Sequence, residues 1–146
     1  MDKLVIRGGN PLQGDVKISG AKNAVLPIMA SSLLVDGITV IRKVPDLRDT
    51  KTFIKLLEIL GAKCVLDGST LSVDASDINS LEAPYDLVKT MRASFYVMGP
   101  LLGRFGETKV SLPGGCAWGP RPVDYHLKGF EKLGASIDLN QGYILA

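Results

Sequence analysis

One stretch of the chain, residues 112–126, combines groups that could carry out chemistry. It reads LPGGCAWGPRPVDYH and holds three glycines, three prolines, the thiol of Cys116 and, five residues later, the guanidinium of Arg121. Glycine widens the conformations open to a loop, whereas proline narrows them. A thiol can act as an acid or a nucleophile, and a guanidinium can bind an anion. The stretch, called the lid below, is therefore predicted to be a catalytic loop that can close over a substrate.

A second group of polar residues lies at the predicted start of a helix. Lys22 and Asn23 precede an apolar run that predicts a buried helix over residues 24–35, and Asn23 is a suitable N-cap for it. A cation beside a helix N-terminus is opposed by the helix dipole unless an anion also binds there. Lys22 is therefore a candidate ligand for an anionic substrate.

Two stretches of the chain repeat each other. Residues 54–73 (IKLLEILGAKCVLDGSTLSV) align with residues 127–146 (LKGFEKLGASIDLNQGYILA) at an offset of 131 − 58 = 73. Upstream, Gly37 aligns with Gly106 at an offset of 106 − 37 = 69, so the second copy is four residues longer and the insertion coincides with the lid. Each copy is predicted to be a helix-strand-helix-strand-strand unit that shares a core with its neighbour.

The repeat also predicts where the charged residues meet. At the offset of 69, Arg92 corresponds to Asn23 (92 − 69 = 23), so both are expected at the start of the first helix of their units. Pseudosymmetry would then bring Lys22, Asn23 and Arg92 towards one place, where they could bind a ligand that carries a phosphate and a carboxylate.

Hydrophobic periodicity and turn residues predict the elements of these units. Asp49 is a candidate cap of the second helix and Gly61 its stop, and a Gly99–Pro100 break is expected in the third helical segment. The predicted helices cover residues 24–35, 50–60, 83–106 and 124–133, and the predicted strands cover residues 4–7, 16–19, 38–42, 63–66, 70–73, 110–112, 136–139 and 143–145.

Composition narrows the class of protein. The 146 residues, 46% of them hydrophobic, suffice for one packed domain, and a net charge of +2 does not favour nucleic acid or an anionic membrane as a partner. Cys64 and Cys116 lack metal-ligand spacing and are expected as free thiols, with Cys64 in the core. Without a signal sequence or a long apolar run, the protein is expected to be soluble and cytoplasmic. No metal and no cofactor are predicted.

Five motifs in collinear order resemble the UDP-N-acetylglucosamine enolpyruvyl transferases. They are the lid together with KNAVLP (22–27), LEILGA (57–62), KTMRAS (89–94) and GPLLGRFG (99–106). The resemblance implies an α/β (α+β) fold of the inverse α/β kind, with repeated helix-strand-helix-strand-strand units around buried helices. Members of this family have two similar domains of three units each, and their substrates bind between the domains.

The resemblance implies a reaction and a set of site residues. The enolpyruvyl group of phosphoenolpyruvate is transferred to the 3′-hydroxyl of UDP-N-acetylglucosamine and phosphate is released, in the first committed step of bacterial peptidoglycan synthesis. Cys116 resembles the lid cysteine that protonates phosphoenolpyruvate or forms a covalent adduct with it, and that fosfomycin alkylates. The implied phosphoenolpyruvate ligands are Lys22, Asn23 and Arg121, and the implied UDP-N-acetylglucosamine ligands are Arg92, Arg121, Pro122, Val123, Asp124 and Tyr125.

The family's length also bears on the expectations for this chain. By the resemblance, residues 1–21 are a strand segment that packs with the second domain, and residues 22–146 are two units of an incomplete first domain. A third unit, the second domain and its carboxylate base would lie outside the chain, so little turnover and some self-association are expected. A non-catalytic UDP-sugar-binding module and a structural fragment without function remain alternatives.

Two residues in and after the lid receive separate interpretations. His126, the only histidine, lies in the first turn of a predicted helix, which favours capping or positioning over catalysis. Trp118 stands where relatives carry a smaller aliphatic residue, which bears on how the lid moves and not on its chemistry.

Overall fold

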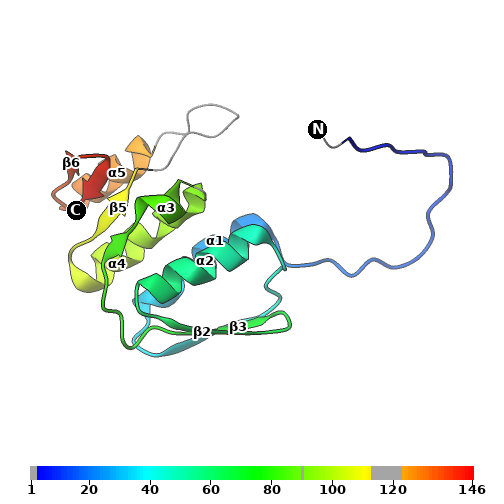
Figure 1. The fold of residues 1–146 in the computed structure, drawn as a ribbon, viewed down its shortest axis with the longest axis horizontal. Helices are drawn as coiled ribbons and strands as arrows, with labels where there is room; N and C mark the ends of the chain where they lie inside the picture. The colour runs from blue at the N-terminus through cyan, green and yellow to red at the C-terminus, as the bar shows by residue number, and fades with distance from the viewer. Residues whose placement is uncertain (1–2, 90, 113–122) are drawn as a thin grey trace.

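The computed structural model describes residues 3–89, 91–112 and 123–146, and two units of the same plan follow one another along the chain (Figure 1). In the first unit, helix α1 continues as the 3₁₀ turn η1 before the first strand. Its elements are α1 (Lys22–Ser31), η1 (Ser32–Leu34), β1 (Ile38–Ile41), α2 (Arg48–Ile59), β2 (Lys63–Asp67) and β3 (Thr70–Asp74).

The second unit repeats this order after a short linking strand and a short helix. Those two elements are β4 (Glu82–Ala83) and α3 (Tyr85–Val88). The first helix of this unit is built from the 3₁₀ segment η2 and helix α4, which are continuous. The elements are η2 (Arg92–Val97), α4 (Met98–Phe105), β5 (Lys109–Ser111), α5 (Asp124–Lys132), β6 (Asp138–Asn140) and β7 (Tyr143–Leu145).

Strand register confirms the repeat at both predicted offsets. The first sheet has the order β1-β3-β2 and the second contains β5-β7-β6, all antiparallel, with β4 added in parallel to β5. In the hairpins, the pair Leu66–Leu71 corresponds to Leu139–Ile144 at an offset of 73. In the outer pairing, Ile41–Leu71 corresponds to Val110–Ile144, which places β5 at an offset of 69 (110 − 41).

One hydrophobic core joins the two units. Helix α2 lies over β2 and β3, and α1 lies beside α2 (Figure 1). The apolar face predicted for α2 is buried, since Phe53, Leu56 and Leu57 are fully inaccessible to solvent. The second unit adds side chains to the same cluster, among them Met98 and Ile144. Burial of this apolar surface is the main stabilising term for the fold.

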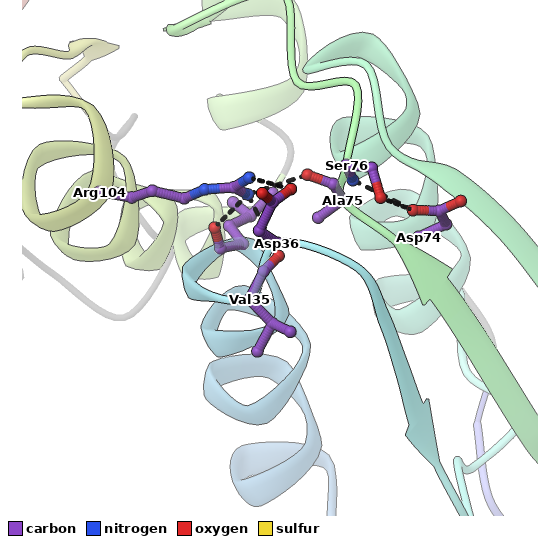
Figure 2. A network of polar contacts seen from close by, with 7 residues as sticks. Val35, Asp36, Asp74, Ala75, Ser76 and Arg104 are labelled. Carbon is purple, nitrogen blue, oxygen red and sulfur yellow. Dashed lines mark hydrogen bonds and ion pairs between the residues drawn. The ribbon is translucent and has the colours of Figure 1, made fainter.

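At the end of α4, the side chain of Arg104 connects the second unit to the first through hydrogen bonds and an ion pair. Arg104 donates from Nη1 to the carbonyl oxygens of Leu33 (3.0 Å), Val35 (3.2 Å) and Ala75 (2.8 Å), and from Nη2 to Asp36 Oδ1 at 3.0 Å (Figure 2). These carbonyls belong to the end of the first helical segment and to the residue after β3. At both places the regular hydrogen bonding of the helix or strand has ended. Arg104 thus satisfies acceptors that would otherwise be partly buried without donors.

The strands predicted at residues 4–7 and 16–19 are not formed. Residues 3–20 contain no helix or strand and extend away from the folded units (Figure 1), and the apolar side chains of Leu4, Ile6, Val16 and Ile18 are exposed. A β-strand needs a neighbouring strand to pair its backbone groups, and the described residues provide none beside this segment.

Three predicted helix boundaries are also wrong. Helix α1 begins at Lys22 after Ala21, so Asn23 lies inside the first turn and does not cap it. Helix α2 begins after Leu47, and the hydroxyl of Thr50, not the carboxylate of Asp49, accepts the Leu47 amide at 3.2 Å. Gly99 and Pro100 fall in the first turn of α4 and do not break it, because proline lacks only a donor that this turn does not use.

Two equivalent glycines end the second helix of each unit, as the sequence predicts for Gly61. Gly61 (φ +107°) and Gly134 (φ +97°) both adopt the left-handed region, and the following amides, of Ala62 and Ala135, each donate to a helix carbonyl at 3.0 Å. This is the Schellman arrangement, in which glycine avoids the steric cost that a side chain would meet.

Substitution of these glycines tests the packing around them. A Cβ on Gly61 would lie 2.7 Å from the Asp77 carbonyl oxygen and 2.8 Å from the Asn79 amide nitrogen, whereas one on Gly134 would meet nothing within 4 Å. We expect Gly61→Ala to lower the free energy of unfolding by about 2–4 kcal/mol, since strain and a backbone clash add. Gly134→Ala should lose only the strain, about 1–2 kcal/mol. Urea unfolding measures both, and equal losses would contradict the proposed clash.

Candidate functional site

The two units enclose a cavity of about 340 Å³ where their first helices meet. Lys22 and Asn23 come from the first turn of α1, Arg92 from the start of η2 and Asp49 from the first turn of α2. The predicted convergence of Lys22, Asn23 and Arg92 is therefore confirmed. The full set of lining residues is Lys22, Asn23, Leu26, Asp49, Met91, Arg92, Ala93, Phe95, Tyr96, Val123 and His126.

Pseudosymmetry explains why these side chains meet. Helix α1 packs against η2, its counterpart in the second unit, so the starts of the two elements adjoin. Asn23 and Arg92 occupy equivalent positions at these starts. The arrangement directs two cations, Lys22 and Arg92, into one hollow, which suits an anionic ligand.

One carboxylate shares the cavity with these cations. Asp49 Oδ2 lies 2.5 Å from Lys22 Nζ, and the two side chains are 30% and 51% exposed. Asp49 is favoured in the first turn of α2 because a negative charge there complements the helix dipole. The pair leaves the described wall of the cavity with a net positive charge when Arg92 is included.

The N-terminus of α5 forms another wall of the cavity. Its lining residues are Val123 and His126, and the His126 ring packs against Phe95 with centroids 5.6 Å apart and planes tilted by 51°. The His126 amide donates to the Val123 carbonyl at 2.9 Å in the first helical turn. His126 thus lines the cavity from the first turn of α5, the position that the sequence predicts for it.

Two other predicted ligands lie near this wall without lining it. Asp124 has one carboxylate oxygen, Oδ1, that is buried and has no hydrogen-bond partner among the described residues. Tyr125 is 79% exposed, and Lys128 Nζ lies 5.9 Å from its ring centroid. A buried acceptor without a donor is costly, so Asp124 has unused capacity to bind a donor group.

Three of the predicted site residues, Cys116, Arg121 and Pro122, lie outside the described residues. Trp118 and the other lid residues from 113 to 122 lie there as well. The described ends of the lid are Leu112, which follows β5, and Val123, which precedes α5 and lines the cavity. Its two ends are thereby positioned by the same unit that contributes Arg92.

The remaining cysteine has the buried character that the sequence predicts. Cys64 lies on β2, is half-buried and packs against the hydrophobic core. Burial, and to a smaller extent the negative charge of Glu58, raises the pKa of the Cys64 thiol to about 12. Because the thiolate is the reactive form, this thiol is unreactive at neutral pH.

A larger cavity, of about 670 Å³, lies at the edge of the second sheet. Its lining includes Glu82, Lys109 and Asp138 but none of the predicted site residues. Lys109 is already engaged there, with Nζ 3.1 Å from Glu82 Oε2 and 4.5 Å from the Tyr143 ring centroid. The smaller cavity is the better candidate, because convergent cations and polar groups identify a site more specifically than volume does.

Sequence reasoning missed part of the cavity wall. Asp49 was interpreted only as a helix cap, and Met91, Phe95 and Tyr96 were not singled out. The signal available for the last three was their place around Arg92 in the KTMRAS motif and the segment after it. No signal in the sequence pairs Asp49 with Lys22, since that contact depends on how α1 packs against α2.

The arrangement of the two units resembles that in a solved enolpyruvyl transferase. The fold is similar to the crystal structure of the enolpyruvyl transferase NikO from Streptomyces tendae, with a TM-score of 0.78 and 28% sequence identity over 94% of this chain and 30% of that chain. The aligned region covers both repeated units, so their arrangement is already known from a solved structure.

The sequence places the chain in a family. The model of the EPSP synthase (3-phosphoshikimate 1-carboxyvinyltransferase) family matches residues 6–146, and the chain belongs to this family. Relatives named UDP-N-acetylglucosamine 1-carboxyvinyltransferase are 61% identical over the whole chain in Chloroherpeton thalassium and 59% identical over 99% of it in Chlorobaculum parvum. The chain spans about a third (34%) of the length of these two relatives.

The described helices include no candidate membrane span. Among the described residues, no helix has both the length and the apolar character needed to cross a bilayer.

Proposed function

We propose that this chain takes part in transfer of the enolpyruvyl group of phosphoenolpyruvate to the 3′-hydroxyl of UDP-N-acetylglucosamine, with release of phosphate. The observation that carries the proposal is the convergence of Lys22, Asn23 and Arg92 on one cavity. Both proposed substrates are polyanions, and cations grouped in a partly enclosed hollow bind such ligands more strongly than isolated surface cations do. The relatives named for this reaction support the assignment.

The proposed roles divide the polar residues between the two substrates. Lys22, Asn23 and Arg121 bind phosphoenolpyruvate, while Arg92 and residues 121–125 bind UDP-N-acetylglucosamine. The unpartnered Asp124 Oδ1 supports the second role, because the uracil ring and the sugar offer N–H and O–H donors. His126 and Phe95 supply an aromatic wall beside them.

The proposed chemistry uses the thiol of the lid. Cys116 donates its proton to the methylene of phosphoenolpyruvate, which leaves an electron-poor carbon that the sugar hydroxyl attacks. The hydroxyl proton is lost to solvent or to the departing phosphate as the carbon–oxygen bond forms. Elimination of phosphate, together with loss of one proton of the new methyl group to the Cys116 thiolate, then restores the double bond. Nearby cations lower the pKa of a thiol and stabilise the phosphate as it leaves, so Lys22 and Arg121 would assist both steps.

We also propose the domain arrangement that the resemblance implies. Residues 1–21 pack with a second domain, residues 22–146 form two units of the first, and a third unit covers α5. Supporting this, Leu133 on the second unit is 86% exposed whereas its equivalent Leu60 is fully buried. An uncovered apolar face of this kind also favours self-association of the chain. The proposed compartment is the cytoplasm.

A non-catalytic UDP-sugar-binding module is the second candidate. It is favoured by the composition of the cavity wall, where Asp49 is the only carboxylate among the described lining residues and is already paired with Lys22. The described wall therefore provides ligands for anions without a free carboxylate base. Both candidates predict that UDP-N-acetylglucosamine binds.

Reaction of the lid thiol with fosfomycin separates the two candidates. With UDP-N-acetylglucosamine present, we expect the Cys116 sulfur to open the epoxide and form one thioether adduct, which mass spectrometry of the intact chain and its peptides detects. Cys116→Ser should abolish the adduct. Binding of the nucleotide sugar without an adduct would favour the module, and an adduct on Cys64 would contradict the assignment.

The pH dependence of alkylation provides an internal control. Because the pKa of Cys64 is about 12, its labelling by iodoacetamide in Cys116→Ser should rise about tenfold for each pH unit between 7 and 10 without levelling off. The fraction of thiolate is far below its maximum throughout that range. A labelling rate that levels off between pH 9 and 10, as expected for a thiol with an ordinary pKa, would show that burial does not suppress this thiol.

A further inference from the structure

The ion pair between Lys22 and Asp49 joins the N-termini of two helices, and its two side chains differ in conformational freedom. Lys22 is the first residue of α1, where the helix dipole opposes its charge, and its ammonium is reached through four rotatable bonds. Asp49 has a short side chain in the first turn of α2, where the dipole favours its charge. The carboxylate is therefore the fixed partner and the ammonium the movable one.

The start of α2 is itself held rigidly. Thr50 is 2% exposed, and its hydroxyl lies 2.7 Å from the Leu47 carbonyl oxygen and 2.9 Å from the Pro45 carbonyl oxygen. The same hydroxyl accepts the Leu47 amide at 3.2 Å. These contacts fix the backbone beside Asp49, so its short side chain projects from a well-defined position.

We infer that Asp49 is a positioning residue that holds the ammonium of Lys22 over the cavity, ready for a phosphate group of an anionic substrate. This inference deepens the proposed function and rests on it for the identity of the substrate. Lys22 is the more exposed member of the pair, at 51% against 30%, so the positive end faces the open side. Pairing at 2.5 Å offsets the repulsion that the carboxylate would otherwise exert on an incoming anion.

A purely structural ion pair would behave differently. Half-exposed pairs contribute little to stability, so neutralising Asp49 should leave the fold intact. If Asp49 only stabilised the fold or only repelled anions, its removal would leave phosphate binding unchanged or strengthen it. If it positions Lys22, its removal weakens binding, and only while Lys22 is present.

A double-mutant cycle on the whole 146-residue chain tests the inference, with inorganic phosphate as the probe in calorimetric or NMR titrations. We expect Asp49→Asn to weaken phosphate binding about fivefold and Lys22→Met about tenfold, and the double variant to match Lys22→Met within about twofold. Asp49→Glu should recover most of the affinity. Asp46→Asn is the matched control, since Asp46 pairs with Lys51 at 2.7 Å outside the cavity.

The outcomes that overturn the inference are distinct from failure of the proposed function. Phosphate binding that is absent in the parent chain, or is unchanged or tighter in Asp49→Asn, would overturn it, as would a fivefold loss that persists in the Lys22→Met background. If UDP-N-acetylglucosamine does not bind while the phosphate cycle gives the expected coupling, the proposed function fails and the positioning role of Asp49 stands.

Discussion

Replacing Arg104 with methionine is expected to lower the free energy of unfolding by about 2–4 kcal/mol. The Arg104 side chain is 17% exposed and donates to three backbone carbonyls, two at the end of the first helical segment of the first unit and one directly after β3. Its ion pair with Asp36 contributes little, because the Asp36 side chain is 80% exposed. The expected loss therefore comes mainly from the part-buried carbonyls of Leu33 and Ala75, which would lose their charged donor.

Urea unfolding with matched variants measures this loss. Methionine keeps most of the apolar stem of arginine, so the comparison isolates the guanidinium. Arg104→Lys should recover only part of the stability, because an ammonium cannot span the same set of acceptors. Arg42→Met, at an exposed arginine, should change stability by less than about 0.5 kcal/mol. A similarly small change for Arg104→Met would contradict the conclusion that Arg104 stabilises the contact between the two units.

Replacing both Lys22 and Arg92 with methionine is expected to weaken binding of UDP-N-acetylglucosamine at least about tenfold, through loss of Arg92, and binding of phosphoenolpyruvate by a similar factor, through loss of Lys22. Both residues line the cavity from the first turns of equivalent elements. Hydrogen bonds to a charged group contribute about 1.5–3 kcal/mol each, so loss of one such donor for each substrate reaches that factor. Isothermal titration calorimetry measures it, and the unfolding midpoint should stay close to that of the parent chain.

The control for charge alone lies outside the cavity. Lys63 is exposed and pairs with Asp77 at 2.6 Å, and Arg42 is exposed as well. Their joint replacement by methionine removes the same total charge from the molecule while leaving the cavity intact. Binding that falls equally in both double variants would mean that net charge, and not the geometry of Lys22 and Arg92, governs affinity.

The repeat made much of the fold predictable. In the sequence, equivalent glycines and apolar positions of the two copies are offset by 69 and 73 residues, and the strand register shows the same two offsets. Such signals are local, because a turn that requires glycine or a strand that alternates its side chains leaves its mark in adjacent residues. The order of elements and the meeting of Lys22, Asn23 and Arg92 followed from that one pattern.

The features that sequence reasoning missed depend on distant contacts. The apolar run of residues 4–6 and the alternation of residues 16–19 are real, yet pairing decides whether a strand forms. Asp49 is a residue type that often caps helices, but its carboxylate pairs with Lys22, and the Leu47 amide donates instead to the Thr50 hydroxyl. Arg104 reaches carbonyls 29 and 71 residues away in the sequence, which no local pattern reveals.

Two-dimensional ¹H–¹⁵N NMR on the isotopically labelled chain maps directly where UDP-N-acetylglucosamine binds. We expect the largest amide shifts on residues 22–23, 91–96 and 123–126, which surround the smaller cavity. Shifts centred instead on residues 79–82, 107–109 and 136–138, around the larger cavity at the sheet edge, would contradict this expectation, as would an unchanged spectrum at millimolar ligand.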